Sequence, residues 1–376
     1  IQNTECRLLI PDSCIPYFGA CMAGPLSKYS FINAKLRARI SKILPDELFE
    51  ELAKAPSIDA ALVLLRDTPF GGLDETYSQT GDLKQAEFDL LRSEIDLYRN
   101  IRQYVHQNSA QLLDAMLSQF EIENLKNAIR IYFDRQIRRR SVESSTHYIL
   151  YERIVHDVPI DIIVNADSFE EIAGACEGTP YSQIIRKYSH TVESEGSLFR
   201  MEIALDHFYY RNLLSSIDRL DRRDRTIALR LTGVEIDLQN INWIIRFKNF
   251  YDLPLEAVLA AIVPGGFNLD KTVMGELYTA QNVTSVLQGF VKRKYPALSA
   301  LLSAQTADST SRLLLIRRIL EEIMKHEVHR ILAGYPFTIG ITLSYFVLKR
   351  NELKKVRTIL NAKYYGIEQE RIESMI

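Results

Sequence analysis

The stretch that decides the fold is HEVHRILAGYPFTIGITLSYFVLKRNELKKVRTILNAKYYGI, residues 326–367. After Pro336 it contains no further proline and a single glycine, Gly340, before Gly366. Apolar residues recur three and four positions apart, as on one face of a long amphipathic helix. They are Ile339, Leu343, Phe346, Val347, Leu353, Val356, Leu360 and Tyr364. Gly366 stands where a C-terminal cap belongs, and the stretch therefore predicts one long helix that ends just before it.

The composition is that of a folded protein with a large core. Of the 376 residues, 47% are hydrophobic and 25% are charged, and the net charge is −2. This charge gives no support to nucleic-acid binding. The most apolar run, residues 336–348, is shorter than the roughly 20 residues that a membrane-spanning helix needs. We therefore expect a soluble protein without a membrane span.

The four cysteines do not indicate a disulfide framework. Cys6, Cys14 and Cys21 lie close together near the beginning of the sequence, and Cys176 stands alone. This usage is typical of a reducing compartment. A zinc site formed by the first three is conceivable, but their spacing matches no common zinc motif. We expect no metal and no cofactor.

Secondary-structure signals favour helices almost throughout. Residues 1–28 contain several prolines and glycines and form an atypical N-terminal segment, whereas later prolines fall at the edges of helical patterns. The best strand candidate, Ile160 to Val164, is short and flanked by helical patterns. The sequence thus predicts an all-α protein.

A first motif recurs along the chain and consists of an acidic residue, an Asn three positions later and an Arg six positions after the Asn. It occurs at Glu121 and at Asp237, a related copy begins at Tyr29, and the closing helix carries a degenerate copy that begins at Glu352. The Asn and basic residues of the motif are Asn33, Arg39, Asn124, Arg130, Asn240, Arg246, Lys248 and Lys363.

A second motif also recurs. SIDAALVLLRDTPF, residues 57–70, corresponds to SFEEIAGACEGTPY, residues 168–181, and more weakly to residues 282–295. Each copy opens on a residue that caps helix N-termini, here Ser57, Ser168 or Asn282, and ends on an aromatic residue. Ser168 with Glu171 predicts a capping box.

These repeats predict three helical units over residues 29–119, 120–234 and 235–376, the last including the closing helix, which we expect to pack near the first unit. Solenoid repeats have about 20–50 residues, so units of this length favour a compact three-lobed body. The Asn and the Arg of the first motif point about 120° apart on a helix. We therefore interpret the Asn as bonding across a helix junction and the Arg as tying one lobe to the next.

Motifs of catalysis are weak or incomplete. GYPFTIG, residues 334–340, lacks the lysine of a phosphate-binding loop, and His326 and His329 have the wrong spacing for a zinc helix. The acidic residues of DRLDRRDR, residues 218–225, resemble a magnesium–diphosphate motif, but the intervening arginines favour an exposed face of ion pairs. We expect no enzyme active site.

Several of these stretches resemble the C/d subunit family of rotary V-type and A-type ATPases. They are YSFINAKLRARI, FEIENLKNAIR, EIDLQNINWIIRFK, the paired Thr-Pro-aromatic sequences, and HEVHRIL followed by the closing helix. The resemblance covers about residues 29–376. Residues 1–28 look atypical, and Lys355 stands where the upstream motif has Asn.

The resemblance implies a funnel of three helical lobes that acts as a non-catalytic rotor subunit. Such a subunit sits peripherally on the cytoplasmic face of a membrane, on the proteolipid ring, and seats the central shaft of D and F subunits. It thereby couples ATP hydrolysis or synthesis to ion transport, with a transient contact to the membrane stator subunit.

Two alternatives remain open on the sequence. A helical scaffold or tethering protein would fold in the same way but would not bind a rotary motor. A helical enzyme acting on diphosphates would need paired acidic motifs, and residues 218–224 supply a single weak candidate. Co-purification with a proteolipid ring would favour the rotor subunit, and binding of magnesium or nucleotide would favour the enzyme.

Overall fold

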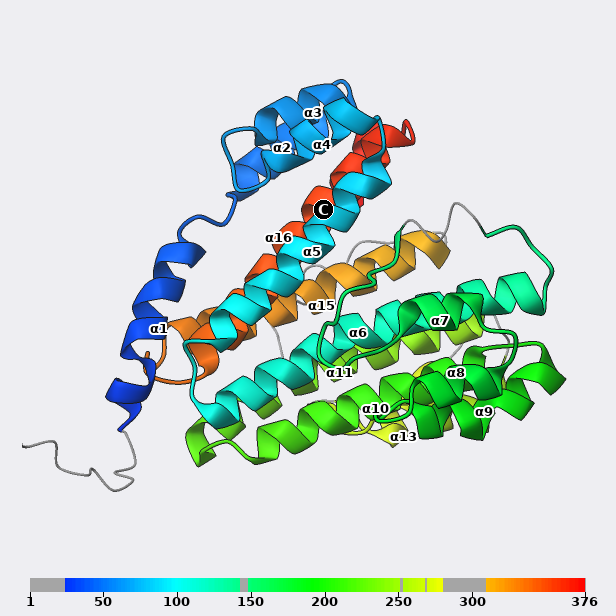
Figure 1. The fold of residues 1–376 in the computed structure, drawn as a ribbon. Helices are drawn as coiled ribbons and strands as arrows, with labels where there is room; N and C mark the ends of the chain where they lie inside the picture. The colour runs from blue at the N-terminus through cyan, green and yellow to red at the C-terminus, as the bar shows by residue number, and fades with distance from the viewer. Residues whose placement is uncertain (1–23, 143–147, 251–252, 268, 280–308, 376) are drawn as a thin grey trace, which may run out of the picture.

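The computed structural model describes residues 24–142, 148–250, 253–267, 269–279 and 309–375 (Figure 1). Across these ranges the chain forms sixteen helices and no strand, so the all-α prediction is confirmed. The strand candidate at Ile160 to Val164 belongs to a short helix, α7. None of the helices described here is both long and apolar enough to cross a membrane.

The N-terminal third forms one set of helices with the C-terminal end of the chain. After α1 (Pro25–Ile40), three short helices follow, α2 (Asp46–Lys54), α3 (Ile58–Leu65) and α4 (Gly72–Thr80), and then the long α5 (Leu83–Arg102). The closing helix α16 (Gly340–Tyr364) runs antiparallel to α5, and α17 (Gln369–Met375) packs on α2 (Figure 1).

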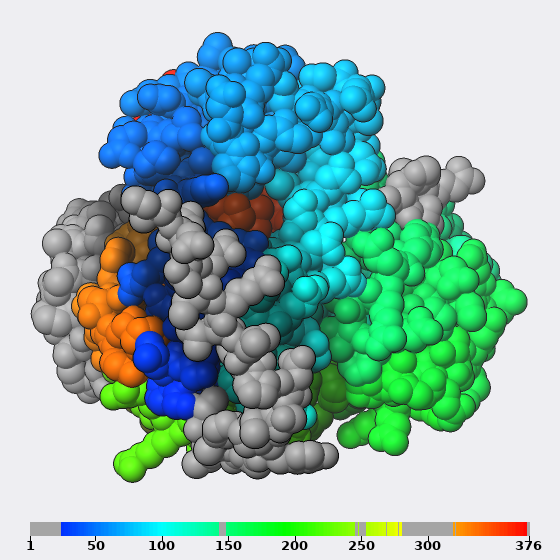
Figure 2. Space-filling model, turned by 60° about the vertical axis from the view of Figure 1, so that its left-hand side comes forward, coloured from blue at the N-terminus to red at the C-terminus, as the bar shows by residue number. Residues whose placement is uncertain are grey.

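Two further sets have the same parts as α16, α2–α4 and α5 of the first set. Each has a long helix, several short helices, and a second long helix, here called the return helix. The second consists of α6 (Gln107–Gln136), α7 (Ile160–Asn165), α8 (Phe169–Ala175), α9 (Ser182–Glu195) and α10 (Phe199–Asp218). The third contains α11 (Arg222–Phe250), α12 (Leu255–Ala261), α13 (Lys271–Thr279) and α15 (Ser309–Leu332). In Figure 2, α2–α5 (blue to cyan) form one mass and the green residues of the second set another.

Helix α16 begins and ends as its sequence predicts. Most of the predicted stripe is buried, with Val347 partly exposed and Tyr364 exposed. Gly366 adopts a φ of 66°, and the next amide, that of Ile367, donates to the Ala362 carbonyl over 2.8 Å. This is the hydrogen bond of a Schellman ending, which glycine accepts without strain.

The second motif forms the same local structure at both copies that are described. The Ser57 and Ser168 hydroxyls each cap a helix by accepting an amide hydrogen bond of 3.2 Å. At the other end, the Thr68 and Thr179 hydroxyls each accept the amide of the aromatic residue two positions later. Asn282 to Tyr295 and the cysteines Cys6, Cys14 and Cys21 lie outside the described residues.

The closing helix contributes to the core of the first set. Phe49 of α2, Leu62 of α3 and Phe70 of the turn after α3 pack with Val356 and Leu360 of α16 in one buried cluster. The predicted unit boundaries at 119/120 and 234/235 fall inside the continuous helices α6 and α11. These boundaries stay a prediction of where one repeat unit ends and the next begins.

Candidate functional site

The Asn of the first motif forms the same clamp in two helices. In α6 the Asn124 amide donates to the Leu150 carbonyl over 2.7 Å and accepts from the Leu150 amide over 2.9 Å. In α11 Asn240 makes the same two bonds with Val263, of 2.8 and 2.9 Å. Because both partners are backbone groups of a segment beside the helix, the clamp fixes where that segment crosses it.

The acidic residue of the motif also binds backbone. Glu352 accepts the amide of Leu44 over 2.8 Å, and Asp237 accepts that of Leu269 over 3.2 Å. Each amide lies just before a short helix, α2 or α13. The motif thus docks the short helices of a set onto its long helix. The sequence pattern includes these acids but did not place them among the candidate site residues.

Glu121 is the most heavily bonded of the three acids. It accepts the amides of Val155 and His156, over 2.7 and 2.6 Å, the His156 ring and the Tyr181 hydroxyl. Burial by itself would raise the pKa of Glu121, but the hydrogen bonds from His156, Tyr181 and the two amides hold it below its usual range.

The basic residues of the motif have different partners. Arg130 donates to Glu202 over 2.7 Å and joins α6 to α10 within one set, so the interpretation that it ties one lobe to the next is wrong for this residue. Lys363 donates to the Ala53 carbonyl in α2. The side chains of Arg246 and Lys248 lie outside the described residues.

The first copy of the motif, in α1, makes no backbone clamp of the kind found in α6 and α11. Asn33 donates to the Pro336 carbonyl, which precedes α16, and its oxygen accepts from Arg37 over 3.1 Å. Arg39 donates to Asn100 of α5 over 3.1 Å. These two residues fasten α1 to the body.

The acidic stretch of residues 218–225, which runs into the first turn of α11, is only partly the exposed ion-pair face that its sequence predicts. Asp224 is 3% exposed and accepts the Tyr29 hydroxyl of α1 and the Ile339 amide at the start of α16, the latter over 2.9 Å. Asp218 and Asp221 do lie in exposed pairs, with Arg225 and Lys28. The difference arises because Asp224 points toward two segments more than 100 residues away.

Three residues that lie two positions before the acids of the motif come together at the centre of the molecule. Arg350 of α16 bonds to Glu235 of α11 and, over 3.1 Å, to the Tyr98 hydroxyl. Gln119 of α6 accepts from the Tyr209 hydroxyl over 3.4 Å. Burial raises the pKa of Tyr209 well above its ordinary value, and the nearby Glu235 carboxylate adds to this. We call these five residues the central cluster.

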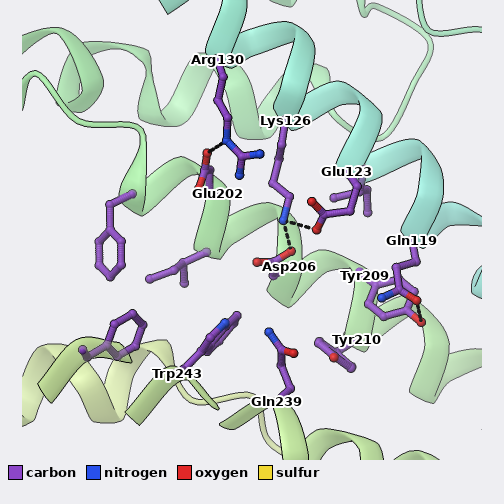
Figure 3. Close-up of a pocket in the computed structure, with 14 residues that line it drawn as sticks. Gln119, Glu123, Lys126, Arg130, Glu202, Asp206, Tyr209, Tyr210, Gln239 and Trp243 are labelled. Carbon is purple, nitrogen blue, oxygen red and sulfur yellow. Dashed lines mark hydrogen bonds and ion pairs between the residues drawn. The ribbon is translucent and has the colours of Figure 1, made fainter. Parts of the chain in front are cut away.

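A cavity of about 240 Å³ lies beside the central cluster between α6, α10 and α11 (Figure 3). The Lys126 amine lies 2.6 Å from the Glu123 carboxylate and 2.7 Å from that of Asp206, while Gln239 and Trp243 face it from α11. Burial would lower the pKa of Lys126, but the two carboxylates raise it. Lys126 therefore stays charged and is held between two carboxylates.

A second cavity, of about 500 Å³, lies on the other side of the cluster, between α5 and α16. Glu94 of α5 and Arg357 of α16 line it, with 3.9 Å between the nearest oxygen and nitrogen. The Arg357 Nε and Nη2 atoms are buried without a hydrogen-bond partner among the residues described. Burial raises the pKa of Glu94, which is 7% exposed.

Both cavities are suited to recognition by charge. Their linings consist of ionised, amide, aromatic and aliphatic side chains and one threonine, and hold no serine, cysteine or histidine. In the described part of the chain, no group of three or more His, Cys, Asp or Glu side chains is placed to hold a metal ion. At His326 and His329, the intervening Glu327 is fully buried and pairs with Arg230 and Arg330.

The chain matches known proteins over nearly its whole length. The family described as "ATP synthase (C/AC39) subunit" matches residues 32–375. The C subunit of the A-type ATP synthase of Methanocaldococcus jannaschii is 22% identical, and that of Methanosphaera stadtmanae is 24% identical. The alignments cover 93% and 89% of this chain and 86% and 84% of those relatives. The relative from Pyrococcus abyssi is 22% identical, over 93% of this chain and 90% of its own. This chain therefore belongs to the ATP synthase (C/AC39) subunit family.

Proposed function

We propose that the protein is the non-catalytic subunit of a rotary A-type or V-type ATPase that links the central shaft of D and F subunits to the membrane proteolipid ring. In this role it sits peripherally on the cytoplasmic face of the membrane and couples ATP hydrolysis or synthesis to ion transport. The family match across residues 32–375 carries the proposal. A transient contact with the membrane stator subunit belongs to the same proposal.

The interactions of the long helices support a part that transmits torque. Helices α6, α11 and α16 contain 30, 29 and 25 residues. In the central cluster Arg350 joins α16 to α11 through Glu235, and Gln119 joins α6 to α10 through Tyr209. Close-packed helices deform little under load, because protein interiors are as dense as organic crystals. Polar bonds at the point of convergence also oppose sliding of one helix along another.

The two cavities give the proposal a place for the shaft. Arg350 lines the cavity between α5 and α16, and Gln119 lines the cavity between α6, α10 and α11. The cluster therefore lies between them. We propose that the three helix sets form the lobes of a funnel and that the shaft end lies against this inner region, with the ring on the opposite side.

Binding and flotation test the proposal directly. The full chain should co-elute with a complex of the D and F shaft subunits and should float with vesicles that carry the proteolipid ring. Bare vesicles of the same lipids serve as the control and should leave the chain in solution. A chain that binds neither shaft nor ring, or that floats equally well with bare vesicles, would contradict the proposal and favour a scaffold.

A further inference from the structure

Two other arginines of this protein bind carboxylates through the edge of the guanidinium that carries the Nε and Nη2 atoms, and in Arg357 this edge is unused among the described residues. Arg102 binds Asp114 through its Nε and Nη2 atoms, and Arg230 binds Glu327 through the same two atoms. This edge of a guanidinium matches both oxygens of a carboxylate at once. In Arg357 the corresponding Nε and Nη2 atoms are buried and have no acceptor among the described residues.

The carboxylate nearest to this edge does not occupy it. Glu94 approaches the Arg357 Nη2 atom to 3.9 Å, which is outside hydrogen-bonding range. The other carboxylate in the lining, Glu87, accepts from Asn361. The neighbouring cations of α16 are also engaged, Arg350 with Glu235 and Lys354 with Glu321. Arg357 thus has two donors without an acceptor among the described residues, and it lines a cavity large enough for a side chain from another molecule.

The surroundings of Arg357 favour an acidic occupant of low charge. A smaller cavity of about 330 Å³ shares Glu87 and Arg357 with the 500 Å³ cavity and adds Lys84 and Tyr148. The two linings together contain four cationic residues, Lys84, Arg350, Lys354 and Arg357, and two acidic ones. Glu235 and Glu321, outside the linings, neutralise Arg350 and Lys354, so the attraction for an anion comes mainly from Arg357 and Lys84. The nearby Glu94 and Glu87 disfavour a doubly charged phosphate more than a singly charged carboxylate.

We propose that the Arg357 edge between α5 and α16 is the receptor for an Asp or Glu side chain of the shaft. Because its Nε and Nη2 atoms are buried, the guanidinium turns toward the cavity to bind this carboxylate with two parallel hydrogen bonds. The inference rests on the proposed function, because that function supplies the partner. It adds the chemistry of one contact and the residue that makes it.

Calorimetric titration of the D and F shaft complex into the full chain tests the inference. Arg357→Met should weaken binding at least about 30-fold, as removal of one partner of a buried, hydrogen-bonded charge pair does. Arg357→Lys should also weaken binding, because an ammonium group keeps the positive charge but cannot make two parallel hydrogen bonds to one carboxylate. The matched control is Arg186→Met, which removes an exposed arginine of α9 that pairs only weakly with Glu170 and Glu177, and it should bind like the parent.

Thermal unfolding of the same variants separates binding from folding. Since the Arg357 Nε and Nη2 atoms have no acceptor among the residues that the structure describes, Arg357→Met should melt no earlier than the parent. A clear drop in its melting midpoint would show that these atoms already have a partner within the chain and would overturn the inference.

Substitutions in the shaft identify the acid. Each Asp and Glu near the shaft end is changed to Asn or Gln, and one change should weaken binding as much as Arg357→Met and add nothing to it. If no carboxylate behaves in this way, the site does not receive a carboxylate of the shaft. A parent that fails to bind the shaft overturns this inference and the proposed function together, whereas undiminished binding by Arg357→Met overturns this inference alone.

Discussion

The helix pair α6/α10 and the helix pair α5/α16 occupy corresponding places in the repeat. The first pair is joined by a close ion pair, whereas in the second the corresponding charges stay farther apart. Lys126 stands five residues after Glu121, and Arg357 stands five residues after Glu352. The Lys126 amine lies 2.7 Å from a carboxylate of the return helix, that of Asp206. The Arg357 guanidinium lies 3.9 Å from Glu94 of its own return helix.

The residue three positions before Lys126 or Arg357 on the long helix explains this difference in distance. In α6 that position is Glu123, which lies 2.6 Å from the Lys126 amine. In α16 it is Lys354, which has the same sign as Arg357 and turns to Glu321 of α15 over 2.7 Å. Opposite charges three positions apart attract on a helix and like charges repel. One pair therefore brings its charges into contact, whereas the other leaves two Arg357 donors without an acceptor among the described residues.

The largest change in stability should come from removing the cation of the Lys126–Asp206 ion pair. Lys126→Met leaves the largely buried Asp206 carboxylate without its cation, and should lower the free energy of unfolding by about 3–5 kcal/mol. Urea denaturation measures this. The double variant Lys126→Met/Asp206→Leu should recover much of the loss, and a single variant within about 0.5 kcal/mol of the parent would show that the pair is not structural.

The backbone clamps should come next in size. Asn124→Ala and Asn240→Ala each remove two hydrogen bonds to backbone groups beside a long helix, and each should cost about 1–3 kcal/mol in urea unfolding. Asn124→Asp buries a carboxylate with one oxygen against the Leu150 carbonyl, so it should cost more than Asn124→Ala. Weaker shaft binding with an unchanged denaturation midpoint would instead place these residues on a contact surface.

The two sets should differ in their response to acid. The lowered pKa of Glu121 means that it stabilises the fold above the usual carboxyl pKa and loses this contribution as the pH falls, by at most about 1.4 kcal/mol per pH unit. The raised pKa of Glu94 has the opposite sign, because protonation relieves the cost of burying its charge. Glu121→Gln should therefore flatten the acid limb of stability against pH, and Glu94→Gln should steepen it. Urea midpoints between pH 3 and 7 check both slopes, and equal slopes would contradict the contrast.

The smallest change in stability should follow substitution at the Arg357–Glu94 pair. Arg357→Met removes no hydrogen bond made by the guanidinium in the described structure, so its free energy of unfolding should stay within about 0.5 kcal/mol of the parent. The matched comparison with Lys126→Met, measured under the same conditions, is the sharpest test of the contrast. Similar losses for both would mean that the two pairs have the same role.

The sequence by itself determined the helices and their local signals. The stripe and Gly366 predicted α16, and Ser57 and Ser168 marked the starts of α3 and α8, because caps and helical periodicity depend on residues within a few positions of one another. The first motif singled out Asn124 and Asn240, whose clamps repeat because the residue types repeat. The resemblance to the C/d subunit family rested on these same stretches.

The tertiary structure alone decided which side chains meet. Gln119, Glu235 and Arg350 occupy one position of the repeat but share no residue type, so no pattern of residues could place them at the centre together. Asp224 is buried because α1 and the start of α16, both distant in sequence, bring donors to it. The open donors of Arg357 likewise depend on where α5 and α15 place their carboxylates, which is set by packing between helices and not by the order of residues along any one of them.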